Sequence, residues 1–280
     1  MPDANLDQAV DGIIGAAFGL GFIFGPIIGG YLGQFGSRVP FIAAAIFTLL
    51  NLLYGYFILP ESLAKKNRRK FDITRANPVG TLKSLKRYPV ISGLLVCIVL
   101  FNIAQHATHS TWTFFTIEKF SWGESTVGYS LGFIGLLAAI VQGGLIRVII
   151  PKIGNIRSVY FGMVFYIVGL ILISLAEEGW MIFVFVIPLS LGGISGPALQ
   201  GIMTNNIPDN EQGEFQGGMT SLISLTAILG PLIMTNLFSF YTSDNTGIYF
   251  PGAPFVLGAI LSVCGLIIAI RFLSKRDIRY

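Results

Sequence analysis

Residues 12–33, with the sequence GIIGAAFGLGFIFGPIIGGYLG, form an apolar stretch without a single charged side chain. A helix that crosses a lipid bilayer needs about 20 consecutive, mostly apolar residues, and this stretch meets that length. An amphipathic helix of a soluble protein would instead show polar residues recurring along one face. The stretch is therefore predicted to be a transmembrane helix.

Long apolar stretches also make up most of the remaining chain. Only 11% of the residues are charged and 53% are hydrophobic, whereas soluble domains carry about 25% charged residues. The mean hydropathy of +0.73 agrees. We therefore expect an all-α integral membrane protein with eight transmembrane helices. The predicted spans are 12–33, 40–59, 90–114, 126–149, 157–176, 180–204, 214–240 and 253–273.

The basic residues are distributed unevenly between the links. If the N-terminus is cytoplasmic, 16 of the 18 lysines and arginines fall in cytoplasmic segments, and only Arg38 and Lys119 fall outside. Cytoplasmic loops of membrane proteins carry such an excess. The pattern predicts a multi-pass protein of the inner (plasma) membrane with both termini in the cytoplasm. The net charge of +4 is then explained by the basic cytoplasmic segments of a membrane protein. We therefore expect no nucleic-acid partner.

The longest link, residues 60–89, holds nine of the 18 basic residues. Within it, residues 78–88 place Val79, Leu82 and Leu85 on one helical face, with the basic side chains elsewhere. This pattern is typical of a helix that lies on the inner leaflet. A solvated basic linker is the alternative interpretation.

A long-range repeat indicates two related halves. Gly12 precedes Gly25-Pro26 by thirteen residues in the first span, and Gly217 precedes Gly230-Pro231 by the same interval in the seventh. A Pro-Phe pair then opens the second span and the eighth. Parallel repeats of this kind build two-halved transporters with six helices in each half.

The repeat predicts how the chain is organised. Residues 1–59 would be the last two helices of an N-terminal half, 60–89 a cytoplasmic linker, and 90–280 a complete six-helix C-terminal half. Four further N-terminal helices would then be encoded elsewhere, upstream of Met1.

The first span is also rich in glycine around a proline. Glycines spaced by four allow close helix approach, and a proline removes one helical hydrogen bond and permits a kink. A closely packed, bendable helix suits the rocking interface between two halves, although a plain packing face is the alternative. The candidate residues are Gly21, Gly25, Pro26, Gly29 and Gly30.

The third span holds the most polar side chains at membrane depth. Asn102, His106 and His109 follow one helical face, and Gln105 lies beside them. Polar groups in a bilayer are costly unless they face a cavity or a partner, and histidine can carry a proton near neutral pH. We expect a substrate or proton path here, with His106 the better candidate and with Gln142 of the fourth span nearby. Interhelical hydrogen bonding is the alternative.

The sequence lacks the residue patterns that several kinds of function require. None of the 14 acidic residues falls in the middle of a span, so a proton would have to use a histidine or a carboxylate in further helices. The sequence contains no phosphate-binding Gly-Lys-Ser/Thr loop. It also shows no pattern of a nucleophile triad or of a metal cluster. We therefore expect neither an enzyme nor a bound cofactor.

These motifs resemble the major facilitator superfamily, and within it the tetracycline-resistance type of drug–proton antiporter. Residues 21–30 resemble the antiporter motif of that family's fifth helix. Residues 59–62 resemble the end of its sixth helix, residues 196–201 its tenth helix, and residues 212–217 the entry to its eleventh. The family's signature loop, between its second and third helices, would belong to the missing N-terminal part. Its counterpart after the fourth span survives only faintly at residues 151–157, which lack the aspartate.

The resemblance implies a function. It implies alternating-access efflux of tetracycline, as a magnesium chelate, or of another amphipathic drug, driven by the proton gradient. The partners would be the lipid bilayer, the drug and protons. Two alternatives stay open: a truncated, transport-inactive membrane remnant, and a carrier of the same fold for another small solute.

Overall fold

The computed structural model describes residues 38–60, 89–243 and 247–274, together with positions 21, 28, 32, 35 and 36. The chain divides into two compact units, Met1–Lys70 and Phe71–Tyr280. This division falls inside the predicted link 60–89. The expected surface helix 78–88 lies outside the described residues, as does nearly all of the first predicted span. The assignment of the units to two transporter halves stays a prediction.

The smaller unit contributes helix α2 (Val39–Phe57), which matches the predicted second span. Pro40 lies in its first turn, where a missing backbone N–H removes no helical hydrogen bond. None of the α2 side chains is buried in the described structure.

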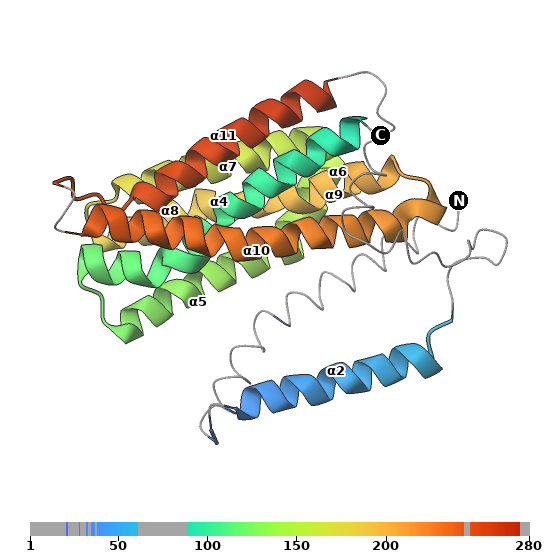
Figure 1. The fold of residues 1–280 in the computed structure, drawn as a ribbon, viewed down its shortest axis with the longest axis horizontal. Helices are drawn as coiled ribbons and strands as arrows, with labels where there is room; N and C mark the ends of the chain where they lie inside the picture. Colours follow the sequence, from blue (N-terminus) through green and yellow to red (C-terminus); the bar gives the residue numbers. More distant parts are fainter. Residues whose placement is uncertain are drawn as a thin grey trace. The chain divides into compact units, whose positions relative to one another are not determined.

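The larger unit is a bundle of helices, several of them interrupted (Figure 1). The elements are α4 (Pro89–Phe120), α5 (Glu124–Ile140), the π-helical η2 (Val141–Leu145), α6 (Ile146–Ile153), α7 (Asn155–Leu175), α8 (Gly179–Leu191), the 3-10 turn η3 (Gly192–Ile194), α9 (Ser195–Asn205), η4 (Asp209–Glu211), α10 (Gln212–Thr242) and α11 (Ala253–Leu273). Among the described residues, seven helical segments are long and apolar enough to cross a membrane, one in the smaller unit and six in the larger. They correspond to seven of the eight predicted spans.

Two helices, α4 and α7, make the most extensive contacts of the larger unit. The first of them is α4. It packs against α11 and α10, while α7 packs against α11, α8 and α9. Phe115 of α4 and Phe255 of α11 are fully buried and meet edge to face, with ring centroids 4.7 Å apart. Since lipid tails are as apolar as these side chains, the contacts stabilise the bundle by close packing rather than by removal of water.

Helix α7 approaches its neighbours backbone to backbone at two glycines. A Cβ atom added to Gly169 would lie 2.6 Å from the Cα of Leu189 on α8. A Cβ atom added to Gly162 would lie 2.7 Å from the backbone nitrogen of Ser195 on α9. These contacts hold the interrupted span α8–η3–α9 against α7.

A buried hydrogen bond attaches α5 to α4. The indole N–H of Trp112 donates to the hydroxyl oxygen of Ser130 at 3.0 Å, and that hydroxyl donates to the Val127 carbonyl at 2.7 Å. Both side chains are 2% exposed, so water cannot replace the bond.

Replacing Ser130 with alanine should leave the Trp112 N–H buried without a partner. We expect a loss of about 1–3 kcal/mol in the free energy of unfolding, the penalty for an unsatisfied buried donor. The matched control is Ser221→Ala, because the Ser221 hydroxyl is exposed and bonds the Gly217 carbonyl of its own helix. Reversible unfolding of both variants in mixed micelles measures the difference, and equal stabilities would contradict the assigned role.

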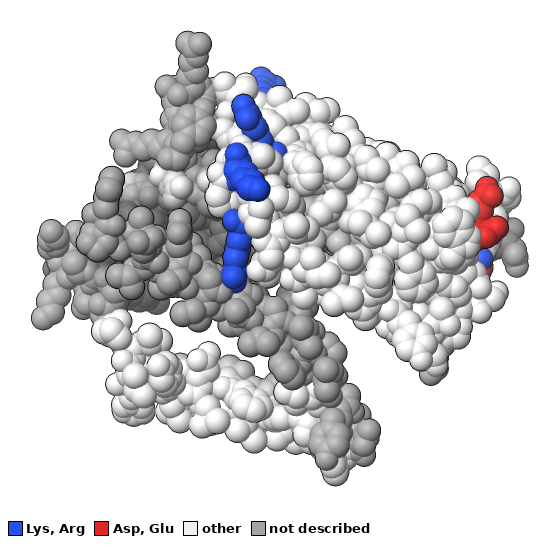
Figure 2. Space-filling view, turned by 180° about the vertical axis from the view of Figure 1, so that it is seen from behind, with Lys and Arg blue, Asp and Glu red and all other residues white. Residues whose placement is uncertain are grey.

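Charged side chains gather at opposite ends of the larger unit (Figure 2). The end formed by α6, the start of α7 and the end of α11 carries Arg147, Lys152, Arg157 and Arg271. The other end carries Glu118, Lys119, Glu177 and Glu178, beside the ends of α4 and α7. There the Tyr249 hydroxyl donates to Glu118 at 3.1 Å. Partial burial and the neighbouring carboxylate raise the pKa of Tyr249.

Candidate functional site

Polar side chains of α4 enter two cavities of the larger unit. The first cavity has a volume of about 160 Å³. Its walls come from four spans: Phe101, Gln105, Thr108 and His109 of α4, Ile134 and Ala138 of α5, Val141 and Gln142 of η2, Tyr166 of α7, and Leu189, Ser190, Gly192 and Gly193 of the α8–η3 span.

Two interrupted helices meet at this first cavity. The π-helical turn η2 carries Gln142 into the wall, and η3, which contacts η2, contributes Gly192 and Gly193. A Cβ atom on Gly192 would lie 2.6 Å from the Cβ of Tyr166, so glycine at this position lets the tyrosine ring enter the wall. Because π-helical turns occur frequently at functional sites, the placement favours a binding role for this cavity.

The second cavity has a volume of about 240 Å³. Those two residues line both cavities. The remaining lining residues are Cys97, Ile98 and Asn102 of α4, Met163 of α7, Ser195, Gly196, Pro197, Leu199 and Gln200 of α9, and Met219 and Ile223 of α10. The two cavities therefore adjoin one another at Phe101 and Gln105.

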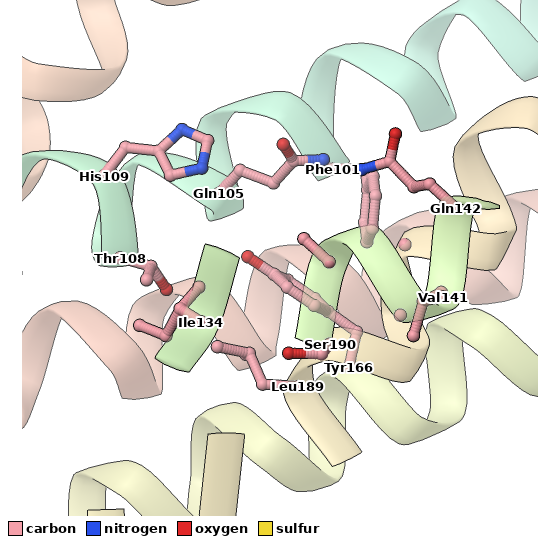
Figure 3. Close-up of a pocket in the computed structure, with 13 residues that line it drawn as sticks. Phe101, Gln105, Thr108, His109, Ile134, Val141, Gln142, Tyr166, Leu189 and Ser190 are labelled. Carbon is pink, nitrogen blue, oxygen red and sulfur yellow. The ribbon is translucent and has the colours of Figure 1, made fainter. Parts of the chain in front are cut away.

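The lining is mostly apolar, with a few polar side chains. No Asp, Glu, Lys or Arg lines either cavity in the described part of the chain. Amide groups come from Gln105 and Gln142, which extend toward one another in Figure 3. The Phe101 and Tyr166 rings meet edge to face with centroids 4.8 Å apart. Such a surface can bind an aromatic, amphipathic molecule through ring contacts and a few hydrogen bonds.

The structure brings together four of the five residues predicted for the substrate or proton path. Gln105, His109 and Gln142 line the first cavity, and Asn102 and Gln105 line the second. The amide nitrogen of Asn102 also donates to the Ile98 carbonyl of its own helix at 2.9 Å. Whether these residues contact a substrate or carry a proton stays a prediction.

His106 lies apart from them. Its ring covers Gly230 of α10, where an added Cβ would come within 2.3 Å of the imidazole. Its Nδ1 lies 3.3 Å from the hydroxyl of Ser110, and its ring centroid lies 6.1 Å from that of His109. The sequence favoured His106 over His109, but the structure places His109, not His106, in a cavity wall.

The residues predicted for the rocking interface lie almost entirely outside the described part of the chain. Gly21 is described as helical and exposed, with open space where a Cβ would be. Gly25, Pro26, Gly29 and Gly30 are outside the described residues. Their role stays a prediction.

Sequence inspection missed Thr108 and Tyr166 in the first cavity. Thr108 follows Gln105 by three residues and so shares its helical face, which could have identified it. Tyr166 lies mid-span in α7, away from the membrane interfaces where tyrosine is usually found, and that position was a signal as well. Within the described residues, no group of three or more His, Cys, Asp or Glu side chains could hold a metal ion.

Comparisons with known proteins agree with the fold. Two relatives from Escherichia coli are tetracycline resistance protein class C, 33% identical over 85% of this chain, and class E, 34% identical over 92%. The chain spans about 60% of the length of these relatives, 60% and 62% respectively.

A solved structure has the same arrangement of helices. The crystal structure of the human organic anion transporter MFSD10 (TETRAN) superposes with a TM-score of 0.76 at 21% identity, covering 94% of this chain and 63% of that protein. Residues 1–231 match the family model described as Major Facilitator Superfamily. The seven described apolar helices, the superposition and this match lead to one conclusion: the chain belongs to the major facilitator superfamily.

Proposed function

We propose that the chain acts in proton-coupled efflux of tetracycline-like or other amphipathic drugs. The observation that carries the proposal is the pair of mostly apolar cavities that share Phe101 and Gln105 and contain no Asp, Glu, Lys or Arg among their described lining residues. The similarity to tetracycline resistance proteins supports the drug class. By the same resemblance, the drug would bind as a magnesium chelate. Alternating access, by rocking of two helical halves, would expose the cavities to each side of the membrane in turn.

The proposed location is the inner (plasma) membrane, with both termini in the cytoplasm. The gathering of Arg147, Lys152, Arg157 and Arg271 at one end of the larger unit supports this orientation, because basic residues favour the cytoplasmic side. In this orientation α4 begins in the cytoplasm and ends at the outer surface. Gln105 and His109 then lie within the bilayer.

The test is drug-dependent proton movement in proteoliposomes that contain the full chain. With an inward-directed proton gradient across oriented vesicles, tetracycline and Mg²⁺ should accelerate collapse of the gradient while drug moves the opposite way. Vesicles without protein are the blank. Drug moving in the same direction as protons would contradict the exporter, and absence of both movements would support the alternative of a transport-inactive remnant.

A carrier of organic anions is a second candidate, because the human structural neighbour is an organic anion transporter. The two cavities disfavour an anionic substrate, because no Lys or Arg of the described residues lines them. Competition of a carboxylated dye with tetracycline in the same vesicles distinguishes the two.

In the proposed cycle a histidine carries the proton. His109 is favoured because it lines the first cavity, whereas His106 packs against Gly230. We expect His109→Gln to flatten the pH dependence of transport and His106→Gln to leave its shape unchanged. Transport rates measured across a pH series in both variants check this. An unchanged profile in His109→Gln would remove that residue from the proton path.

A further inference from the structure

Two glutamine side chains from different spans meet at the first cavity. Gln105 comes from α4 and Gln142 from η2, and in Figure 3 they extend toward one another from opposite sides. Both residues are half-buried, and neither amide makes a hydrogen bond to a described residue. The polar atoms of both amides nevertheless keep accessible surface. The two amides are therefore available to a molecule that enters the cavity.

The spacing of the lining residues explains why the Gln142 amide enters the cavity. Ile134, Ala138 and Gln142 recur every fourth residue along the α5–η2 span and so share one helical face. With Val141 they make up the described lining from this span, in which Gln142 is the one polar side chain. A polar group within a bilayer is costly unless it faces a cavity or a partner. Since no described residue bonds it, the Gln142 amide is left to bond what the cavity holds.

Two converging amides match a group that both donates and accepts hydrogen bonds. Each glutamine amide carries two N–H donors and a carbonyl oxygen that accepts. Rotation of the amide by half a turn exchanges the nitrogen and the oxygen. A primary carboxamide can pair with either orientation, whereas a ketone only accepts. No Lys or Arg lines this cavity in the described part of the chain, which favours a neutral group over a carboxylate.

The remainder of the first cavity accommodates an aromatic ring. Its volume is about 160 Å³, and a cavity of about 150 Å³ accommodates benzene. The rings of Phe101 and Tyr166, with centroids 4.8 Å apart, belong to the lining and offer aromatic contacts. Gln105 also lines the second cavity, so a solute larger than one ring would extend past this residue into the second cavity.

We propose that Gln105 and Gln142 form an amide clamp that binds the primary carboxamide of an aromatic solute. The carboxamide pairs with both glutamine amides, and the ring that carries it packs beside Phe101 and Tyr166. The amide clamp deepens the proposed function and rests on it, because it assumes that the cavities receive the exported solute. It adds the chemical group by which that solute is recognised.

Binding of two small probes tests the amide clamp without requiring transport. Para-fluorobenzamide and para-fluoroacetophenone have nearly the same shape, and a methyl group in the ketone replaces the donating NH₂ of the amide. Their binding to the full chain in lipid nanodiscs can be followed by fluorine NMR, with empty nanodiscs correcting for uptake into lipid. We expect the benzamide to bind about two- to twelvefold more tightly, the factor that corresponds to one net hydrogen bond.

Substitution of the two glutamines assigns that preference to the amide clamp. Gln105→Leu and Gln142→Leu should each lower the preference for the benzamide, and the double variant should bring it near unity. If a leucine variant does not fold, Gln105→Met or Gln142→Met serves in its place, because methionine keeps the length and flexibility of the side chain. Asn236→Leu is the matched control, since Asn236 is an exposed amide within a span that lines neither cavity.

The outcomes separate the amide clamp from the proposed function. A preference lost in the double variant but kept in Asn236→Leu supports the amide clamp, whether or not the vesicles transport drug. The amide clamp is overturned if the unmodified chain shows no preference, if the double variant keeps it, or if Asn236→Leu loses it equally. If tetracycline transport is nevertheless observed, only the amide clamp fails and the proposed function stands.

Discussion

Replacing Gly169 with alanine is expected to destabilise the larger unit strongly. The new methyl carbon would lie 2.6 Å from both the Cα and the backbone nitrogen of Leu189, so α7 and α8 would have to move apart. Backbone atoms cannot rotate away as a flexible side chain could. Overpacking of this kind costs about 1–3 kcal/mol. Because the same approach holds Leu189 in the wall of the first cavity, the change should enlarge or distort that wall as well.

The matched control is Gly128→Ala on α5. Gly128 is exposed, and no atom lies within 4 Å of the position that its Cβ would take. This change should preserve or raise stability, because alanine favours a helix over glycine by about 1 kcal/mol. Thermal unfolding of both variants, monitored by helical circular dichroism in the same detergent, gives the comparison. If Gly169→Ala proved as stable as Gly128→Ala, the close approach of α7 and α8 would be wrong.

Replacing Gln105 with leucine is expected to weaken drug binding about tenfold, near the upper limit for one hydrogen bond. Gln105 lines both cavities, so one substitution removes its amide from the lining of each. Leucine is close to glutamine in size, and Gln105 is only half-buried, so the substituted chain should still fold. The dissociation constant for tetracycline with Mg²⁺, measured by drug fluorescence in nanodiscs, reports the change.

Asn236→Leu provides the control for that experiment. Asn236 is an exposed amide within a span, and its side chain bonds the Leu232 carbonyl of its own helix at 2.7 Å. It lines neither cavity. The Asn236→Leu substitution should therefore leave the dissociation constant for tetracycline unchanged. Equal weakening in both variants would indicate a general effect of losing an amide in the membrane rather than a contact made by Gln105.

Some of the candidate site followed from helical periodicity. Asn102, Gln105 and His109 were grouped because their spacing places them near one another on α4, and each does line a cavity. Periodicity could not distinguish His106 from His109. That distinction depends on α10, whose Gly230 receives the His106 ring across a gap of more than 120 residues in sequence. The Gly230-Pro231 pair is recognisable in the sequence as part of a repeat, but its packing partner is not.

The amino-acid sequence alone determined the class of protein, its described membrane spans and its resemblance to a transporter family. These properties depend on consecutive residues: an apolar run long enough to cross a bilayer is a local feature. Only the tertiary structure decided which polar groups meet. The shared lining at Phe101 and Gln105 and the entry of the Tyr166 ring beside Gly192 depend on how helices cross, and glycines such as Gly169 set those crossings through contacts between distant segments. Helix rotation and approach are set by such non-local packing, which no single span encodes.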